Sequence, residues 1–440
     1  MFKIIKYLPV FLIVLALLTP GIKGLLYSGN FDPIAYNGDY TMYVLGAQSL
    51  ITSGDGVSFT GQIMGYLYAQ PLPSLLIFMF TNIFNNFLAF YAMVILFTLL
   101  AYYWIRRLGF DPYISLIPLL FNNGIILSLF HVTQIDALLI THRIANPLLS
   151  LWIFYMFAYY LFKEEKIWPI ILSFTLLVFS YVYFWTSALV MIVVFGLYKK
   201  DYRRTLRILI LCLLPLIVYL VNVLHVSNSI NMLFWQSLNN VVHTHGLIVQ
   251  PYAYVWLIST FIWVLTLFQR RNFKLDILIF SGIAGTFNHV ITGVALQPGH
   301  WHAFIVFPLL LAKIFILLRD RNIKLYRFGY AVCILLMFLF LHKLPVDTEK
   351  IDTINWAYQN LNGIDTILTS EDMSYPALLS GVDTIFTLPV RYMPEDEWDS
   401  RKIIYADYLG GISMCNIYTP YVYSDFTLPC GIHSDKIYVC

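Results

Sequence analysis

The sequence predicts an all-α polytopic membrane protein of about 11–12 transmembrane helices, followed by a small α/β domain outside the membrane. The first observation is composition: of 440 residues, 59% are hydrophobic and 12% are charged, and the mean hydropathy is +0.73. The second is that basic residues cluster between hydrophobic runs, and the third is a change of composition after residue 342. Soluble globular domains do not have such a composition.

Hydrophobic segments follow one another from the amino terminus to residue 342. A membrane helix needs about 20 mostly apolar residues, because the hydrocarbon core is about 30 Å thick and offers no partner to backbone groups. Twelve segments approach this requirement, near residues 7–24, 70–84, 86–105, 112–130, 147–162, 167–182, 184–198, 205–223, 251–268, 275–294, 302–318 and 326–342. The first is interpreted as an uncleaved helix, since no small-residue cleavage site follows it.

The positive charges indicate which loops face the cytoplasm. Basic clusters occur at Arg106-Arg107, Lys163 with Lys166, Lys199 to Arg207, Arg270 to Lys274, and Arg319 to Arg327. Under the positive-inside rule these loops are cytoplasmic. The segments 131–146, 224–250 and 297–302 contain one Arg and no Lys, so they are predicted outside. All ten histidines fall on or near that side, either because cytoplasmic loops are short or because the outer loops form a polar site.

The predicted topology has a cytoplasmic amino terminus and an extracytoplasmic carboxyl terminus, which requires an odd number of crossings. The weakest segment is 70–84, which begins Gln70-Pro71-Leu72-Pro73 and is short. We expect it to lie at the outer face, leaving eleven crossings. The alternative is that 167–198 forms one tilted helix, which would place one of two basic clusters outside.

Two domains are predicted. Residues 1–342 form the multipass domain, with an extracytoplasmic loop over 24–70, and residues 343–440 form a soluble extracytoplasmic domain. In this tail, 366–369 and 384–387 have the pattern of buried strands, and 395–405 that of an amphipathic helix.

The cysteines agree with an outer location of the tail. Cys415, Cys430 and Cys440 lie in the tail, and an oxidising compartment would allow one disulfide and one thiol, with Cys430–Cys440 the preferred pair. Zinc is disfavoured, because no CxxC pair or closely spaced Cys/His set is present.

Asp39 is the acidic residue of loop 24–70 that is best placed for chemistry. It lies in Tyr36-Asn37-Gly38-Asp39-Tyr40 at the start of an amphipathic pattern, whereas Asp32 and Asp55 lie in turn sequences. The alternative role of Asp39 is that of a helix N-cap, whose carboxylate accepts hydrogen bonds from the first turn.

The residues around Asp39 resemble a known family. Asp39 is followed in order by Tyr43, Ala47, Gly54, Tyr66, Pro71 and Pro73. This order resembles the first external loop of the GT-C glycosyltransferases, particularly the protein-mannosyltransferase and aminoarabinose-transferase relatives, and the resemblance covers about residues 1–342. It implies inverting transfer of a sugar from a polyprenyl-phosphate donor to an acceptor protein, lipid or glycan on the extracytoplasmic face of the cell membrane. Asp39 would be the catalytic acid or base.

A second acid is expected in a later external loop of this family. Asp136 is the candidate, and His142 and Arg143 follow in the same loop, where they would bind the donor phosphate. The resemblance also implies that Asp39 and Asp136 could hold a divalent cation, Mg²⁺ or Mn²⁺. The alternative for Asp136 and Arg143 is an ion pair at the membrane interface.

The segment Gln297-Pro298-Gly299-His300-Trp301-His302-Ala303-Phe304 resembles the family's late external loop. His302 and Ala303 stand where the family has Arg, so His300 and His302 would bind the donor phosphate in its place. The alternative is an interfacial belt of Trp301 and the two histidines. The segment 243–246 is expected on the same face. Lys313, within a hydrophobic run, is expected to snorkel toward the Arg319 cluster.

Two other classes remain open. A multipass transporter or lipid flippase fits the helices, although almost no acidic residue is expected at mid-membrane depth and no inverted repeat is visible. A sensor or scaffold with an external binding domain is a third option. The sequence lacks nucleotide-binding, zincin and hydrolase motifs, and its basic residues do not interleave with exposed aromatics, so nucleic acid is not an expected partner.

Overall fold

The computed structural model divides the chain into two compact units. Unit 1 contains residues 1–23, 84–219 and 238–345, and unit 2 contains residues 24–83, 220–237 and 346–440. The structure describes residues 71–84, 86–121, 147–164, 166–227, 241–247, 253–269, 272–296 and 299–343, with short stretches between 9 and 18 and beyond 353.

The described part of the chain is mostly helical. The described helices before residue 270 are α4 (Pro71–Ile83), α5 (Asn86–Arg107), η2 (Ile114–Leu116), α6 (Ile117–Leu120), α8 (Leu149–Lys163), α9 (Ile167–Val178), α10 (Val182–Lys199), α11 (Tyr202–Ser227) and α13 (Ala253–Leu267). The later ones are α14 (Phe273–Thr286), α15 (Asn288–Thr292), α16 (Gly299–Trp301), the π-helical turn η5 (His302–Val306), α17 (Phe307–Arg321) and α18 (Ile323–Lys343).

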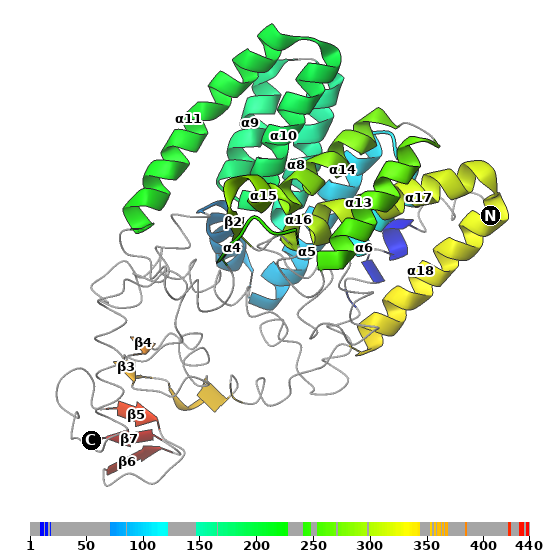
Figure 1. Ribbon diagram of the computed structural model, residues 1–440. Coiled ribbons are helices and arrows are strands. Elements are labelled where there is room, and N and C mark those ends of the chain that lie inside the picture. Colours follow the sequence, from blue (N-terminus) through cyan, green and yellow to red (C-terminus); the bar gives the residue numbers. More distant parts are fainter. Residues whose placement is uncertain are drawn as a thin grey trace. The chain divides into compact units, whose positions relative to one another are not determined.

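The core of unit 1 is a group of helices packed side by side (Figure 1). Helix α8 packs against α5, α9 and α10, and α10 packs against α14. Aromatic rings fill these interfaces: Phe154 of α8 stacks on Phe184 of α10 with ring centroids 5.0 Å apart, and Phe157 contacts Phe174 of α9. The apolar segments therefore bury large rings against one another, which fixes the helices that support the site.

Residues 167–198 form two helices, so the alternative of one tilted helix is wrong. Helix α9 ends at Val178, and α10 begins at Val182 after Tyr181, whose backbone is extended (φ −158°, ψ 117°). The hydroxyl of Ser180 donates to the carbonyl of Leu177, 3.1 Å away. Such side-chain bonds compete with the helical ladder. Because the helix is interrupted here, the start of α10 lies next to the residues that follow α14.

The predicted segment 112–130 does not form one continuous helix. Asp111 accepts hydrogen bonds from the amides of Tyr113 and Ile114, which starts η2, and α6 ends at Leu120 before the extended Phe121 (φ −120°, ψ 127°). The next residues in the sequence are Asn-Asn-Gly, which favour turns. Residues 122–146 lie outside the described part of the chain.

By length and composition, four helices of the described residues could cross a membrane. They are Ala89–Arg107, Val182–Lys199, Tyr202–Val221 and Gly299–Arg321. Leu149–Lys163, Ile167–Val178 and Ala253–Leu267 are apolar but shorter. The chain thus has helices suited to a lipid bilayer, as the composition indicates.

Unit 2 contains α4 (Pro71–Ile83) and short strands. In the tail, β3 (Thr366–Ile367) pairs in parallel with β4 (Asp383–Thr384), at two positions where strands were expected. Strands β5 (Tyr421–Tyr423), β7 (Ile437–Val439) and β6 (Gly431–Ser434) form an antiparallel sheet in that order, which the sequence pattern did not reveal. These strands are two to four residues long. The predicted α/β domain over 343–440 stays a prediction, and residues 395–405 and the three tail cysteines lie outside the described residues.

Candidate functional site

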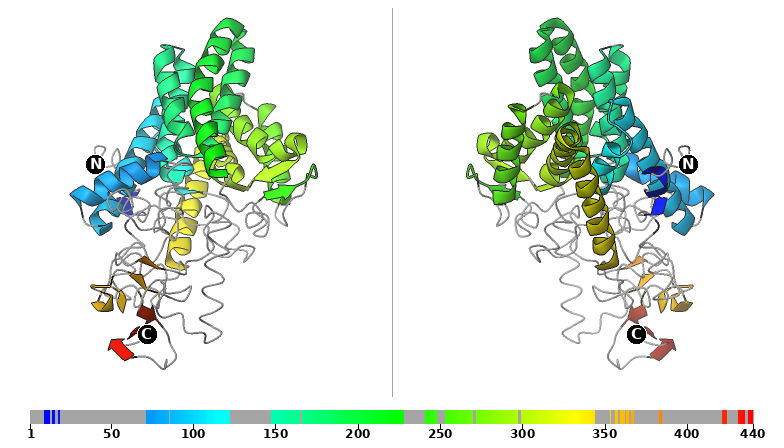
Figure 2. Two further views of the ribbon diagram at one scale, coloured as in Figure 1. Left: turned by 90° about the vertical axis from the view of Figure 1, so that its left-hand side faces the viewer. Right: turned by 90° about the vertical axis from the view of Figure 1, so that its right-hand side faces the viewer.

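The candidate site lies in unit 1 at the end of the helices that is opposite the basic clusters. There α10 begins, α14 ends, and α15 leads through β2 (Val294–Leu296) into α16 and η5 (labelled in Figure 1; Figure 2 gives two side views of the same helices). Because α14 packs against both α10 and η5, it holds the start of α10 and the α16–η5 segment in one cluster. Polar and aromatic side chains gather at this point.

His300 is positioned by two tyrosines from the α9–α10 break. Its Nδ1 lies 2.7 Å from the hydroxyl of Tyr181, and its ring centroid is 4.6 Å from that of Tyr183. Both tyrosines are buried, whereas His300 is half-buried. The direction of this bond depends on the tautomer: where the Tyr181 hydroxyl donates to Nδ1, the proton of the neutral imidazole is on Nε2. In that tautomer His300 is a hydrogen-bond donor whose ring orientation is fixed by Tyr181.

Trp301 anchors this histidine to the helix core. Its indole nitrogen donates to the hydroxyl of Thr186 over 3.2 Å, and its ring meets Tyr183 edge-on at 4.6 Å. The ring packs so closely on α14 that a Cβ added at Gly285 would lie 2.3 Å from Trp301 Cδ1. Only glycine therefore allows this approach. Trp301 is 2% exposed, so the interfacial-belt alternative is wrong for this residue.

His302 occupies a different environment from His300. It is 1% exposed, and its Nε2 lies 2.9 Å from the hydroxyl of Ser259 on α13. Its ring is also near Trp256 of the same helix, with centroids 6.5 Å apart. His302 therefore faces α13, while His300 faces the start of α10. The phosphate-binding role of both stays a prediction, and the burial favours His300 for direct contact with a ligand.

The histidines before residue 300 hold two loops together. Strand β1 (Val241–His243) pairs antiparallel with β2, so the segment 243–246 lies beside the chain that leads into His300, as expected. His245 Nδ1 lies 3.0 Å from the carbonyl of Val290, and His289 Nε2 lies 3.1 Å from the carbonyl of Gly246. These two bonds tie residues 245 and 246, which follow β1, to α15.

Four of the predicted site residues are outside the described part of the chain. They are Asp39, Asp136, His142 and Arg143. Their catalytic, phosphate-binding and metal-binding roles stay predictions. Among the described residues, no group of three or more His, Cys, Asp or Glu side chains could hold a metal ion.

The expectation for Lys313 is wrong. Lys313 is 1% exposed and forms an ion pair with Asp276 of α14, which is 9% exposed, instead of snorkelling toward Arg319. The other carboxylate oxygen of Asp276 accepts a hydrogen bond from the amide of Asn272 over 3.1 Å. A buried ammonium is retained when it has a charged partner, and Asp276 supplies one.

The sequence pattern missed the residues that position the histidines. Tyr181, Tyr183 and Thr186 contact His300 or Trp301, and Ser259 contacts His302. The available signal was Ser180-Tyr181 between two apolar segments, which marks an interruption of the helix. Its partner could not be identified, because Tyr181 and His300 are 119 residues apart.

The arrangement provides a hydrogen-bond donor beside aromatic rings. A neutral His300 donor suits a phosphate oxygen, and a protonated one suits it better because charge-assisted hydrogen bonds are stronger. No protein-family model matches the chain, and no curated protein matches it either.

Proposed function

We propose that the chain is a membrane glycosyltransferase of the GT-C type. It transfers a sugar from a polyprenyl-phosphate donor to an acceptor protein, lipid or glycan at the extracytoplasmic face of the cell membrane. The observation that carries the proposal is the orientation of His300, which Tyr181 holds beside Tyr183 and Trp301 in the segment that resembles the late external loop of that family.

The reaction is a single displacement with inversion. The acceptor oxygen or nitrogen attacks C1 of the sugar, and its proton passes to Asp39. The bond between C1 and the phosphate oxygen breaks, and polyprenyl phosphate leaves. Arg143 and His142 bind the leaving phosphate together with His300, while His302 supports the segment through Ser259.

A divalent cation, Mg²⁺ or Mn²⁺, would be held by Asp39 and Asp136. Carboxylate oxygens are the ligands these ions prefer, and the bound ion would neutralise charge on the leaving phosphate. The other steps of the proposal, proton transfer to Asp39 and phosphate binding by Arg143, His142 and His300, involve only side chains.

The proposal includes the full predicted topology. Eleven of the twelve hydrophobic segments cross the membrane from a cytoplasmic amino terminus, segment 70–84 lies at the outer face, and residues 343–440 form an extracytoplasmic α/β domain. In support, the described helices α8, α10, α14 and α17 each have basic residues at the end opposite His300 or next to that end.

The test measures transfer from a radiolabelled polyprenyl-phosphate sugar by the full chain in proteoliposomes. Asp39→Asn is expected to lower kcat by about 10²–10⁴-fold, the usual contribution of a general acid or base. His300→Gln is expected to raise KM for the donor at least about tenfold, because a hydrogen bond to a charged group contributes about 1.5–3 kcal/mol.

His245→Gln is the matched control. His245 is exposed and bonds to the backbone of Val290, so its loss should leave KM unchanged. Unchanged transfer by Asp39→Asn would refute the catalytic role of that residue. Equal effects of the two histidine substitutions would refute the phosphate contact of His300.

One observation favours a transporter or lipid flippase as the second candidate. The pair Lys313–Asp276 is buried between α17 and α14, and ionisable residues within membrane helices often mark transport pathways. Substrate uptake that is independent of a lipid-phosphate donor and is abolished by Lys313→Met would support this function over sugar transfer.

A further inference from the structure

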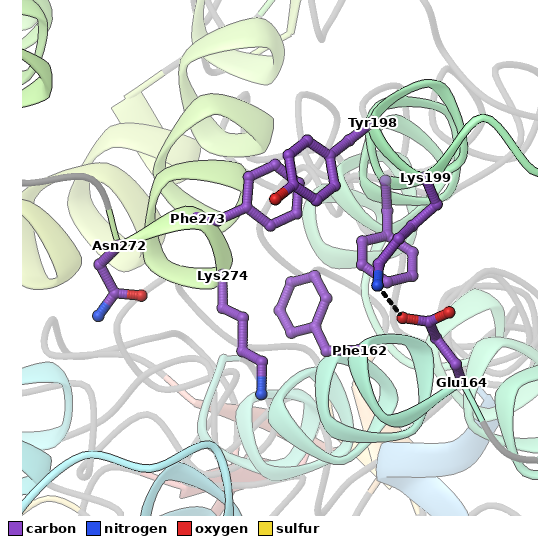
Figure 3. A pocket seen from close by; sticks show the side chains of 8 residues that line it. Phe162, Glu164, Tyr198, Lys199, Asn272, Phe273 and Lys274 are labelled. Carbon is purple, nitrogen blue, oxygen red and sulfur yellow. Dashed lines mark ion pairs between the residues drawn. The ribbon is translucent and has the colours of Figure 1, made fainter.

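A second candidate binding site lies at the opposite end of unit 1, among the basic clusters. It is an open pocket of about 360 Å³ where α8 and α10 end and α14 begins (Figure 3). Its lining residues are Phe162, Glu164, Phe195, Tyr198, Lys199, Asn272, Phe273 and Lys274. Nothing in the proposed sugar transfer uses these residues.

The walls of the pocket are aromatic. The rings of Tyr198 and Phe273 stack, as Figure 3 shows, and Phe195 lies 6.2 Å from Phe273 and 5.3 Å from Phe162 between ring centroids. Tyr198 is exposed and Phe273 is half-buried. Aromatic rings at the ends of apolar helices are typical of the boundary between hydrocarbon and water.

The rim of the pocket carries a surplus of positive charge. Lys199 forms an ion pair with Glu164 at 2.5 Å, and Arg204 donates to the carbonyl of Glu164 over 2.6 Å. Lys274 is exposed and makes no ion pair with a described residue; its side chain extends alongside the Phe162 ring in Figure 3. The one carboxylate of the pocket is thus already paired, and the Lys274 ammonium is available to an anion.

The surrounding sequence extends this charge. Residues 163–166 and 199–207 contain seven basic and three acidic side chains: Lys163, Lys166, Lys199, Lys200, Arg203, Arg204 and Arg207 against Glu164, Glu165 and Asp201. Each basic side chain near an anionic membrane surface contributes about 1 kcal/mol of attraction. The occupant of the pocket is therefore expected to be anionic.

We propose that this pocket binds the headgroup of an anionic phospholipid of the surrounding bilayer. Lys274 contacts the phosphate, and the stacked rings of Tyr198 and Phe273 contact the glycerol and the first acyl carbons. The position of the pocket supports a lipid over a soluble anion, because α10, a helix able to cross a membrane, ends there at Lys199.

The test titrates the purified full chain in detergent with short-chain phosphatidylglycerol and follows the shift in melting temperature. Binding should be saturable, and Lys274→Gln should weaken it about fivefold, the equivalent of about 1 kcal/mol. The matched control is Lys324→Gln, which removes an exposed basic residue of a different helix, α18. This variant should bind phosphatidylglycerol as the wild type does.

Four results would overturn the proposal. Equal binding by the Lys274→Gln and Lys324→Gln variants would remove the pocket as the site. An equal shift with short-chain phosphatidylcholine would show that the charge is irrelevant. An equal shift with inorganic phosphate, or tighter binding of farnesyl phosphate, would assign the pocket to a soluble anion or to an isoprenoid phosphate. Since the readout is lipid binding, the outcome is separable from any failure of sugar transfer.

Discussion

The buried ion pair between Lys313 and Asp276 gives the sharpest test of the packing in unit 1. We expect Asp276→Asn to lower the free energy of unfolding by about 3–5 kcal/mol, because removing one partner of a buried pair leaves an uncompensated charge. Lys313 is 1% exposed, so its ammonium cannot reach water without displacing α17. Two unit charges about 4 Å apart interact by about 4 kcal/mol at an effective dielectric constant of about 20, which agrees with this range.

Replacing the lysine of the pair should lower the free energy of unfolding by less than replacing the aspartate does. Lys313→Met leaves Asp276 with its hydrogen bond from the amide of Asn272 and with more access to solvent, since Asp276 is 9% exposed. We expect Lys313→Met to lower the free energy of unfolding by about 3 kcal/mol or less, the lower end of the range given for Asp276→Asn. The double variant Asp276→Asn/Lys313→Met should lie within about 1 kcal/mol of the wild type, because uncharged replacements of a buried pair are often neutral.

The assay is unfolding of the purified chain in mixed micelles with increasing dodecyl sulfate. The control is Lys199→Gln, which breaks the exposed pair with Glu164 and should cost about 0–1 kcal/mol. If Asp276→Asn alone were as mild as the double variant, the pair would not be buried and coupled, and the reasoning would fail.

Two further predictions concern the support of the site. Gly285→Ala should destabilise the chain by about 1–3 kcal/mol in a thermal unfolding scan, because its Cβ would overlap the buried Trp301 ring. The control is Gly329→Ala, where the nearest neighbour of an added Cβ is 3.6 Å away, and this substitution should be neutral or stabilising. Equal shifts in melting temperature for the two variants would contradict the packing of Trp301 on Gly285. Ser259→Ala should cost about 1 kcal/mol by removing the hydrogen bond with His302, and an unchanged melting temperature would argue against that bond.

Local signals predicted much of the helical structure. The segments 147–162 and 184–198 correspond to α8 (Leu149–Lys163) and α10 (Val182–Lys199) within two residues, because apolar composition and terminal basic residues are local properties. The segment 112–130 was predicted less well: α6 ends at Leu120, and the Asn-Asn-Gly sequence that follows Phe121 was a local turn signal inside an otherwise apolar run.

Contacts between distant segments were beyond the sequence pattern. The expectation for Lys313 assumed that a lone lysine in an apolar run has no partner, whereas Asp276 lies 37 residues earlier in the first turn of α14. His300 was identified as a site residue from its own loop, but Tyr181 was not, because their proximity follows from the packing of α14 against α10 and η5. Such pairs become visible only when the three-dimensional fold brings distant segments of the chain together.

The lengths of the helices indicate how deep His300 lies. Helix α9 has 12 residues and α10 has 18, so they rise about 18 and 27 Å from their basic ends to the Tyr181 break at about 1.5 Å per residue. A hydrocarbon core is about 30 Å thick. If α10 crosses it from its basic end, the Tyr181 break lies close to the far boundary, whereas α9 is about 12 Å too short to cross the same core. The isoprenoid donor proposed above would present its phosphate near that boundary, because its chain stays in the bilayer, and a soluble sugar nucleotide would not.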